Sequence, residues 1–174
     1  GKDLVEEIGL GFSVAQAIET VTGLELSVFE SQFNRWLINW DDPERSAITE
    51  YLGRLDLILA AEAANSDQRA ANLGAQLFIS DSIIARNALV SSTESLVAAL
   101  AQLSPPDRAQ AIHQEATEHL DRVLRWLSLE LQAAEEQNNT PLAEANAMIP
   151  ELTARNFNLN RNISNLKFIF NIPD

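Results

Sequence analysis

Four residues of the types that bind metal ions lie close together in the second half of the chain: His113, Glu115, Glu118 and His119. Glu115 and His119 are four residues apart and would share one face of a helix, whereas His113 lies off that face. A zinc site would need a third protein ligand from another element, and a di-iron bundle carries histidines on two helices. Because these are the only histidines of the chain, we predict no metal site and no bound cofactor.

The same stretch could instead form one edge of a ligand pocket. Glu115, His119, Arg122 and Trp126 follow one another at helical spacing along one flank of an apolar stripe. This row would give a pocket a polar edge and an aromatic wall. The alternative is a boundary row of half-buried side chains that pair with one another along the helix.

Arginines on the middle helices are a second source of ligand contacts. Arg54, Arg69 and Arg86 could each bind a ligand carboxylate through two parallel hydrogen bonds, or they could be ordinary surface residues of amphipathic helices. The residues that we name as candidate ligand contacts are Arg54, Glu115, His119, Arg122 and Trp126.

No catalytic motif is present, and we predict that the chain is not an enzyme and has no catalytic residues. It has no cysteine for thiol catalysis, and a Ser-His-Asp triad would have to assemble around the one histidine-bearing helix. The Gly-x-Ser-x-Gly motif of hydrolases is missing. The glycine motifs that bind phosphates or dinucleotides are also missing, because Gly9-Leu10-Gly11 lies within an expected helix rather than after a strand.

Composition limits the class of protein. The 174 residues are 46% hydrophobic, which suits one domain over residues 1–174 with a core of its own. No apolar run approaches the length of about 18 residues that a membrane-spanning helix needs. The net charge of −13 would repel a phosphate backbone, so we expect no nucleic acid as a partner.

Apolar and small residues recur at steps of three and four from Leu4 to Trp40. This pattern predicts one helix that is packed along its whole length and bends or breaks near Gly23, since glycine weakens a helix. Trp36 and Trp40 lie on the stripe, and we expect both in the core.

Three further helical stretches are expected in the middle of the chain. The first begins with Asp42 as cap and Pro43 at its first position, and a break is expected at residues 65–67. The capping-box spacing of Ser91–Glu94 predicts a short helix that ends near Leu103. The apolar stripes of the first two stretches are Ile48, Leu52, Leu55 and Leu59, followed by Leu73, Leu77, Ile84 and Ala88.

Two helices are expected in the last third of the chain. The first starts at Ser104–Asp107 and ends at residues 137–139. Its stripe is Ile112, Ala116, Leu120, Val123, Leu127, Leu131 and Ala134. The last element starts at Thr140-Pro141, and Pro150 should kink or restart it. Residues 156–172 fit a helix by their seven-residue repeats, but alternation and many asparagines leave a β-hairpin as the alternative.

These elements predict an all-α fold, an up-and-down bundle of four to six long helices. Residues 1–34 carry six acidic residues and one basic residue, whereas residues 152–173 carry three basic residues and no acidic one. The opposite charges would favour contact between the two terminal elements, or they are an ordinary fluctuation of surface charge.

The run from Phe29 to Ala64 resembles a known class of domain. It has a helix that ends in aromatic residues, the acidic turn Asp41-Asp42-Pro43-Glu44, the segment Tyr51-Leu52-Gly53-Arg54-Leu55 and an alanine-rich helix. This pattern is similar to that of the extracytoplasmic helical-bundle sensor domains of bacterial histidine kinases and chemoreceptors. The resemblance implies a periplasmic bundle, anchored by flanking membrane segments at the extracytoplasmic face of the inner membrane. Such a bundle perceives a small molecule or a partner protein and signals by small shifts of its terminal helices.

Two functions are therefore expected as alternatives. The first is a non-enzymatic sensor domain with a ligand site between its helices. The second is an intracellular, cytoplasmic bundle that forms a homodimer or docks a partner protein through an exposed apolar stripe. Flanking membrane segments and the oligomeric state would distinguish the two.

Overall fold

A computed structural model describes residues 2–39, 44–72 and 80–173, without the side chains of residues 2, 4, 5, 36–39, 71 and 72. All regular structure in these ranges is helical, which confirms the all-α fold class. The sequence predicts one domain over residues 1–174, and this stays a prediction. The structure is described as two compact units, Gly1–Asp42 and Pro43–Asp174. The two core clusters of the second unit draw on residues 48–172.

Over its described residues, 2–39, the first unit contains three helices: α1 (Lys2–Gly9), α2 (Val14–Thr22) and α3 (Leu26–Asn39). The single long helix predicted for this region is therefore wrong, although the break near Gly23 is confirmed. Gly23 ends α2 with a φ of 71°, and its N–H donates to the Glu19 carbonyl at 2.8 Å. A second break lies at Gly11, whose φ is 93°, and Ser13 then caps α2 together with the Gln16 side chain.

The stripe predicted for this region is not packed along its length. Among the side chains described in the first unit, only Ala17 and Ile18 are buried, while Ile8 and Phe33 are exposed. The side chain of Trp36 and the whole of Trp40 lie outside the described residues. Their placement in the core stays a prediction, and so does the contact between the oppositely charged terminal elements.

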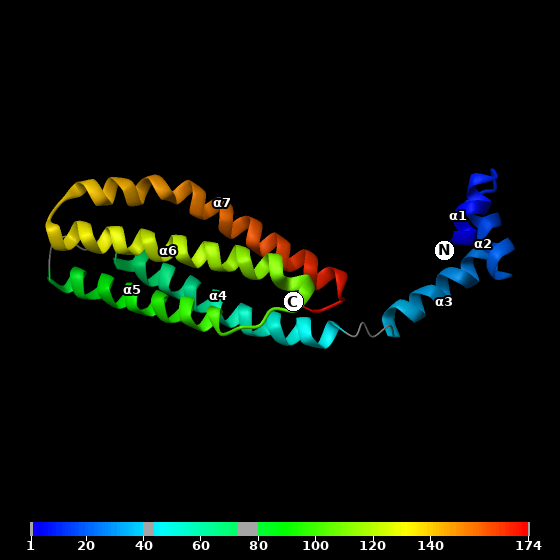
Figure 1. The fold of residues 1–174 in the computed structure, drawn as a ribbon, viewed down its shortest axis with the longest axis horizontal. Coiled ribbons are helices and arrows are strands. Elements are labelled where there is room, and N and C mark those ends of the chain that lie inside the picture. Colours follow the sequence, from blue (N-terminus) through cyan, green and yellow to red (C-terminus); the bar gives the residue numbers. More distant parts are fainter. Residues whose placement is uncertain (1, 40–43, 73–79, 174) are drawn as a thin grey trace. The chain divides into compact units, whose positions relative to one another are not determined.

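In residues 44–72 and 80–173, the second unit is an up-and-down bundle of four helices: α4 (Arg45–Asn72), α5 (Ser80–Ala101), α6 (Gln110–Glu136) and α7 (Asn139–Ile169). Successive helices run in opposite directions, as Figure 1 shows, and each contacts the next. A short 3₁₀ helix, η1 (Asp107–Ala109), precedes α6. None of the described helices combines the length and apolarity that crossing a bilayer requires.

The core of the bundle follows the stripes of α4 and α6. The apolar residues predicted for α6 are all buried except Leu131, which is half-buried. On α4, Ile48, Leu52 and Leu55 are buried and Leu59 packs against them. Both helices therefore have the orientation that their periodicity predicts.

Two breaks predicted in the middle of the chain do not form. The helix α4 continues through residues 65–67 to Asn72, because Asn65 donates from Nδ2 to Ser92 Oγ of α5 at 3.0 Å instead of making a turn. The helix α5 likewise runs through Ser91–Glu94, where Thr93 is buried and donates to the Leu89 carbonyl at 2.9 Å. The predicted stripe of α5 is also wrong where it can be seen, since Ile84 and Ala88 are exposed; Leu73 and Leu77 lie outside the described residues.

The last element is a helix, so the β-hairpin alternative for residues 156–172 is wrong. Leu159, Ile163 and Leu166 recur at helical spacing and are buried in the core. Asn138 caps α7 by accepting from the Thr140 N–H at 3.0 Å, and the helix runs through Pro150 without restarting.

Candidate functional site

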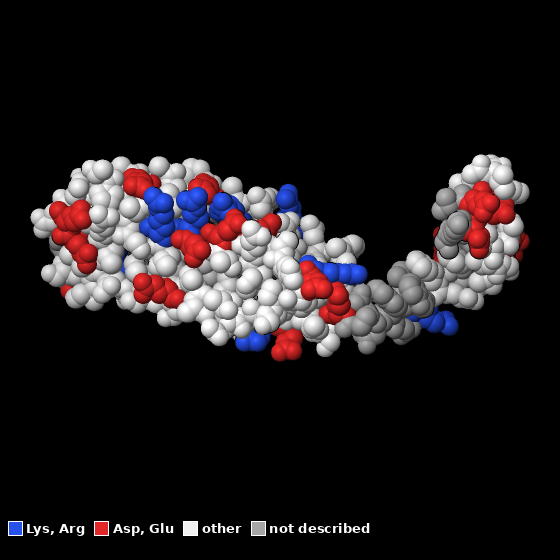
Figure 2. All heavy atoms as spheres, in the orientation of Figure 1, with Lys and Arg blue, Asp and Glu red and all other residues white. Residues whose placement is uncertain are grey.

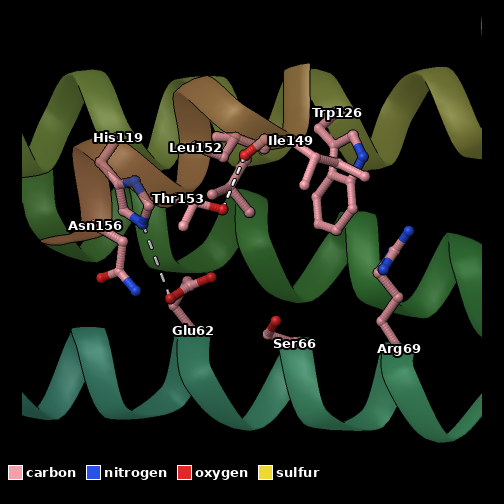
Figure 3. A pocket seen from close by; sticks show the side chains of 10 residues that line it. Glu62, Ser66, Arg69, His119, Trp126, Ile149, Leu152, Thr153 and Asn156 are labelled. Carbon is pink, nitrogen blue, oxygen red and sulfur yellow. Dashed lines mark hydrogen bonds and ion pairs between the residues drawn. The ribbon is translucent and has the colours of Figure 1, made fainter. Parts of the chain in front are cut away.

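A cavity of about 260 Å³ lies between α4, α6 and α7 of the bundle (Figure 3). Residues three or four positions apart share a helix face, so each of these helices presents a short row of side chains to it. The lining residues are Glu62, Ser66 and Arg69 from α4, His119, Val123 and Trp126 from α6, and Ile149, Leu152, Thr153 and Asn156 from α7. One wall is apolar, and the α4 side is polar.

At one end of the cavity, the lining residue Arg69 belongs to a buried ion pair. Glu130 of α6 is only 2% exposed, and Arg69 donates from Nε to its Oε2 at 2.9 Å and from a terminal nitrogen to its Oε1. The guanidinium carbon of Arg69 also lies 3.8 Å from the centre of the Trp126 ring. Two acceptor oxygens and an aromatic face hold this guanidinium, so its charge is neutralised within the wall.

The other end of the cavity holds polar atoms without hydrogen-bond partners. His119 is 3% exposed, and none of the described residues makes a hydrogen bond with either of its ring nitrogens. Its Nε2 lies 3.9 Å from Glu62 Oε2, beyond hydrogen-bond distance (dashed in Figure 3). At the Arg69 end of the cavity, the indole N–H of Trp126 is also buried, and none of the described residues accepts a hydrogen bond from it. Since unsatisfied buried polar groups are costly, these atoms favour a polar occupant of the cavity.

The arrangement suits binding by hydrogen bonds and ion pairs. The hydroxyl of Thr153 already donates to the Ile149 carbonyl at 3.0 Å, and the structure places no histidine within hydrogen-bond distance of it or of Ser66. Within the described ranges, no three histidine, aspartate or glutamate side chains converge in a way that could hold a metal ion.

The five residues predicted as ligand contacts are distributed over different places. His119 and Trp126 both line the cavity. Glu115 lies outside it and accepts from Asn162 Nδ2 at 2.9 and 3.0 Å, and Arg122 lies 3.5 Å from Glu151 on the surface. Arg54 is exposed and lines a separate hollow near Tyr51 and Ser104.

The other two arginines considered for carboxylate binding already have protein partners. Arg69 lines the cavity but is held by Glu130. Arg86 contacts the hydroxyl and the carbonyl of Ser82, one turn earlier on α5.

A network of charged side chains joins the outer faces of α6 and α7. Figure 2 shows basic side chains gathered on one face of the bundle, with acidic side chains beside them. Arg155 of α7 donates to Glu118 of α6 at 3.0 Å and to Glu151 at 2.9 Å, and these hydrogen bonds lower the pKa of both carboxyls. Arg125 of α6 donates to Glu144 of α7 at 2.7 Å. This network is a structural connection between the two helices.

The second histidine has different surroundings. His113 Nδ1 lies 3.2 Å from the hydroxyl of Tyr51 on α4, away from the cavity lining. Burial of the Tyr51 ring raises the pKa of its hydroxyl to about 12. The two histidines thus have separate surroundings: His119 lines the cavity and His113 lies outside it.

Several lining residues were not predicted from the sequence, namely Glu62, Ser66, Thr153 and Asn156, and neither was Glu130, the partner of Arg69. One local signal was available, because Glu62, Ser66 and Arg69 continue the apolar stripe of α4 at the same spacing. Polar residues on a core-facing stripe indicate a buried polar site. Because a helix break is expected at residues 65–67, the sequence alone does not predict that the α4 stripe continues through Ser66 to Arg69.

Comparison of the chain with protein-family models, curated proteins and solved structures finds no match.

Proposed function

We propose that this chain is a non-enzymatic sensor domain that binds a small molecule in the cavity between α4, α6 and α7. The observation that carries the proposal is His119, a nearly fully buried imidazole whose two nitrogens face no hydrogen-bond partner among the described residues. A ligand that hydrogen-bonds these atoms would offset the free-energy cost of burying them. The volume of about 260 Å³ fits a molecule smaller than a typical drug.

Binding would act on the helices that begin and end the bundle. The cavity lies between α4 and α7, and at one end of the bundle Arg45 donates to the Asn171 carbonyl at 2.9 Å. A ligand that prefers one spacing of α4 and α7 shifts the population of helix positions toward that spacing. The proposed output is a small displacement at the end where Arg45 meets Asn171.

The sensor proposal includes an extracytoplasmic location with membrane anchoring through flanking segments. It rests on the resemblance of residues 29–64 to sensor domains of histidine kinases and chemoreceptors. Reading the parent gene on both sides of this chain tests it. Apolar segments of about 20 residues on both sides support the location, and polar flanks contradict it.

A screen of small fragments by NMR tests ligand binding. The chain has only two histidines, so their Hε1 signals can be assigned with a single His113→Gln variant. A true ligand moves the His119 signal saturably and leaves the His113 signal in place. The variant Ser66→Phe places a ring at the mouth of the cavity and should abolish the response. A screen in which no fragment moves His119 contradicts the proposal.

An interaction or oligomerisation module is the second candidate. Phe157 and Phe168 are 68% and 87% exposed, and their spacing of three helical turns puts them on one face of α7. An exposed pair of aromatic rings is typical of a surface that contacts another protein or a second copy. Light scattering on the intact chain tests this: a dimer that Phe168→Ser dissociates supports it, and a monomer at all concentrations contradicts the homodimer.

A further inference from the structure

The charge of Glu62 is only partly compensated within the cavity. Its side chain is 14% exposed, and none of the described residues donates a hydrogen bond to it. The nearest group that could carry a positive charge is His119, at 3.9 Å. Figure 3 shows the Glu62 carboxylate and the His119 ring facing each other, with Ser66 one turn further along α4. A carboxylate in this position favours a cationic partner, because partial burial strengthens the attraction between opposite charges.

Arg69 does not supply the positive charge that would compensate Glu62. Its guanidinium is held by Glu130 and by the Trp126 ring. It also lies seven residues from Glu62 along α4, a rise of about 10 Å. The two charged ends of the cavity are therefore separate. At one end Arg69 is neutralised by Glu130, and at the other end Glu62 has no hydrogen-bond donor among the described residues.

The sign of the charge in the cavity selects between ligands. Leaving His119 aside, the charges of Glu62, Arg69 and Glu130 sum to −1. An anion would lie beside the Glu62 carboxylate, and the one fixed positive charge among the described lining residues, that of Arg69, is already engaged by Glu130. A cation would neutralise Glu62, and the net charge of −13 would also attract it at long range.

Resting on the function proposed above, we infer that the ligand of this cavity is a small organic monocation, a primary ammonium group on a short apolar body. An ammonium group has three donors, and the polar side of the cavity offers it the Glu62 carboxylate, a ring nitrogen of His119 and the Ser66 hydroxyl. The apolar body packs against Val123, Leu152 and Ile149 on the opposite wall. The ion pair of Arg69 and Glu130 limits the length of that body at the far end.

Three probes of nearly equal size and different charge test this inference: butylammonium, 1-butanol and butyrate. Each is titrated into the intact chain at neutral pH, at concentrations that reveal millimolar binding, and the Hε1 signals of both histidines are followed. We expect the His119 signal to saturate with butylammonium at the lowest concentration, with butanol next and butyrate last. The His113 signal should not move with any of them, because His113 is outside the cavity.

Variants of Glu62 assign the charge preference to one carboxylate. Glu62→Gln keeps the shape and removes the charge, so butylammonium should bind about tenfold more weakly or worse, while butanol binding changes little. Glu62→Asp keeps the charge and should keep most of the preference for the cation. Glu50→Gln is the matched control, since it removes the same charge from an exposed position of α4 and should leave all three affinities unchanged.

The outcomes separate this inference from the proposed function. If butanol or butyrate saturates the His119 signal before butylammonium does, or if Glu62→Gln binds butylammonium as the natural chain does, the ligand is not a cation held by Glu62. In that case the cavity is still a binding site, and only the inference about ligand class is overturned. If neither these probes nor any fragment of the screen moves His119, both proposals are overturned.

Discussion

Glu130 is a carboxylate with almost no solvent contact, and its charge is tolerated because Arg69 donates two hydrogen bonds to it. Taking either partner away would leave a bare charge inside the bundle, which is far more costly than losing an exposed pair. The same bundle has exposed ion pairs, such as Arg122 with Glu151, in which both partners are well hydrated. Residues of the same chemical type therefore contribute very differently to stability.

We expect Arg69→Met to lower the free energy of unfolding by about 3–5 kcal/mol, because Glu130 would be buried without a counter-charge. The double variant Arg69→Met with Glu130→Leu should recover most of this loss. Arg122→Met is the control, and its effect should stay below about 1 kcal/mol. Urea unfolding followed by circular dichroism measures all three, and equal losses in Arg69→Met and Arg122→Met would contradict the prediction.

Tyr51 is the only tyrosine of the chain, so its ionisation can be followed by absorbance alone. Burial raises its pKa to about 12 in the folded chain, and we expect a midpoint near that value. In urea the midpoint should fall to the ordinary tyrosine value of about 10. Because the folded pKa is the higher one, the stability linked to Tyr51 is complete below about pH 10 and is lost as pH rises through about 12.

Circular dichroism at each pH of the same titration establishes that the chain is still folded. A folded chain whose Tyr51 ionises near pH 10 would show that burial does not control this hydroxyl.

At the scale of the element, orientation about the helix axis decides what a residue contributes. Leu55 and Leu57 lie two residues apart on α4, and their side chains point in nearly opposite directions. Leu55 is fully buried in the core cluster, whereas Leu57 is 73% exposed. The pair is a matched test of that orientation.

We expect Leu55→Ala to lower the free energy of unfolding by about 2–5 kcal/mol, since it removes core contacts and leaves a cavity. Leu57→Ala should change it by less than about 0.5 kcal/mol. Chemical denaturation of both variants measures the difference. Similar losses in the two would mean that α4 is rotated about its axis relative to the structure.

Pro150 is an element-scale exception, since α7 continues on both sides of a residue that cannot donate a backbone hydrogen bond. We expect Pro150→Ala to raise the free energy of unfolding by about 1–3 kcal/mol, because it restores the donor and removes the steric conflict of the ring. Thermal and urea unfolding measure the gain. An unchanged or lowered stability would show that α7 needs the proline where it passes the cavity.

At the scale of the whole molecule, the four-helix bundle has a core that is complete within itself. Its two clusters contain residues of α4, α5, α6 and α7 and of the segments that join or follow them. The first unit, by contrast, has two buried residues among its described side chains. Independent folding is therefore expected of the bundle.

A fragment of residues 43–174 should unfold cooperatively in urea, with a helical circular dichroism spectrum and a midpoint close to that of the intact chain. A fragment of residues 1–42 provides the comparison and should show weak, non-cooperative helicity, because it buries little apolar surface. Loss of cooperativity in the longer fragment would contradict the division into two units.

Features that act within one stretch of chain can be predicted from the order of the residues. The periodicity of residues 112–134 predicts the buried face of α6, the glycine at position 23 predicts the end of α2, and residues 137–139 predict the boundary of α6 and α7. These signals are local, because a cap or a stripe depends on neighbours within one or two turns.

Features that depend on partners far apart in the sequence become visible only in the folded chain. Asn65 continues a helix because Ser92 receives its amide, and Glu130 can be buried because Arg69, 61 residues away, reaches it. The cavity needs three helices at a particular spacing, so His119 and Glu62 meet only once the bundle has formed. The physical reason is that burial, hydrogen-bond satisfaction and charge compensation are set by which side chains meet in space, and local sequence patterns do not specify those pairs.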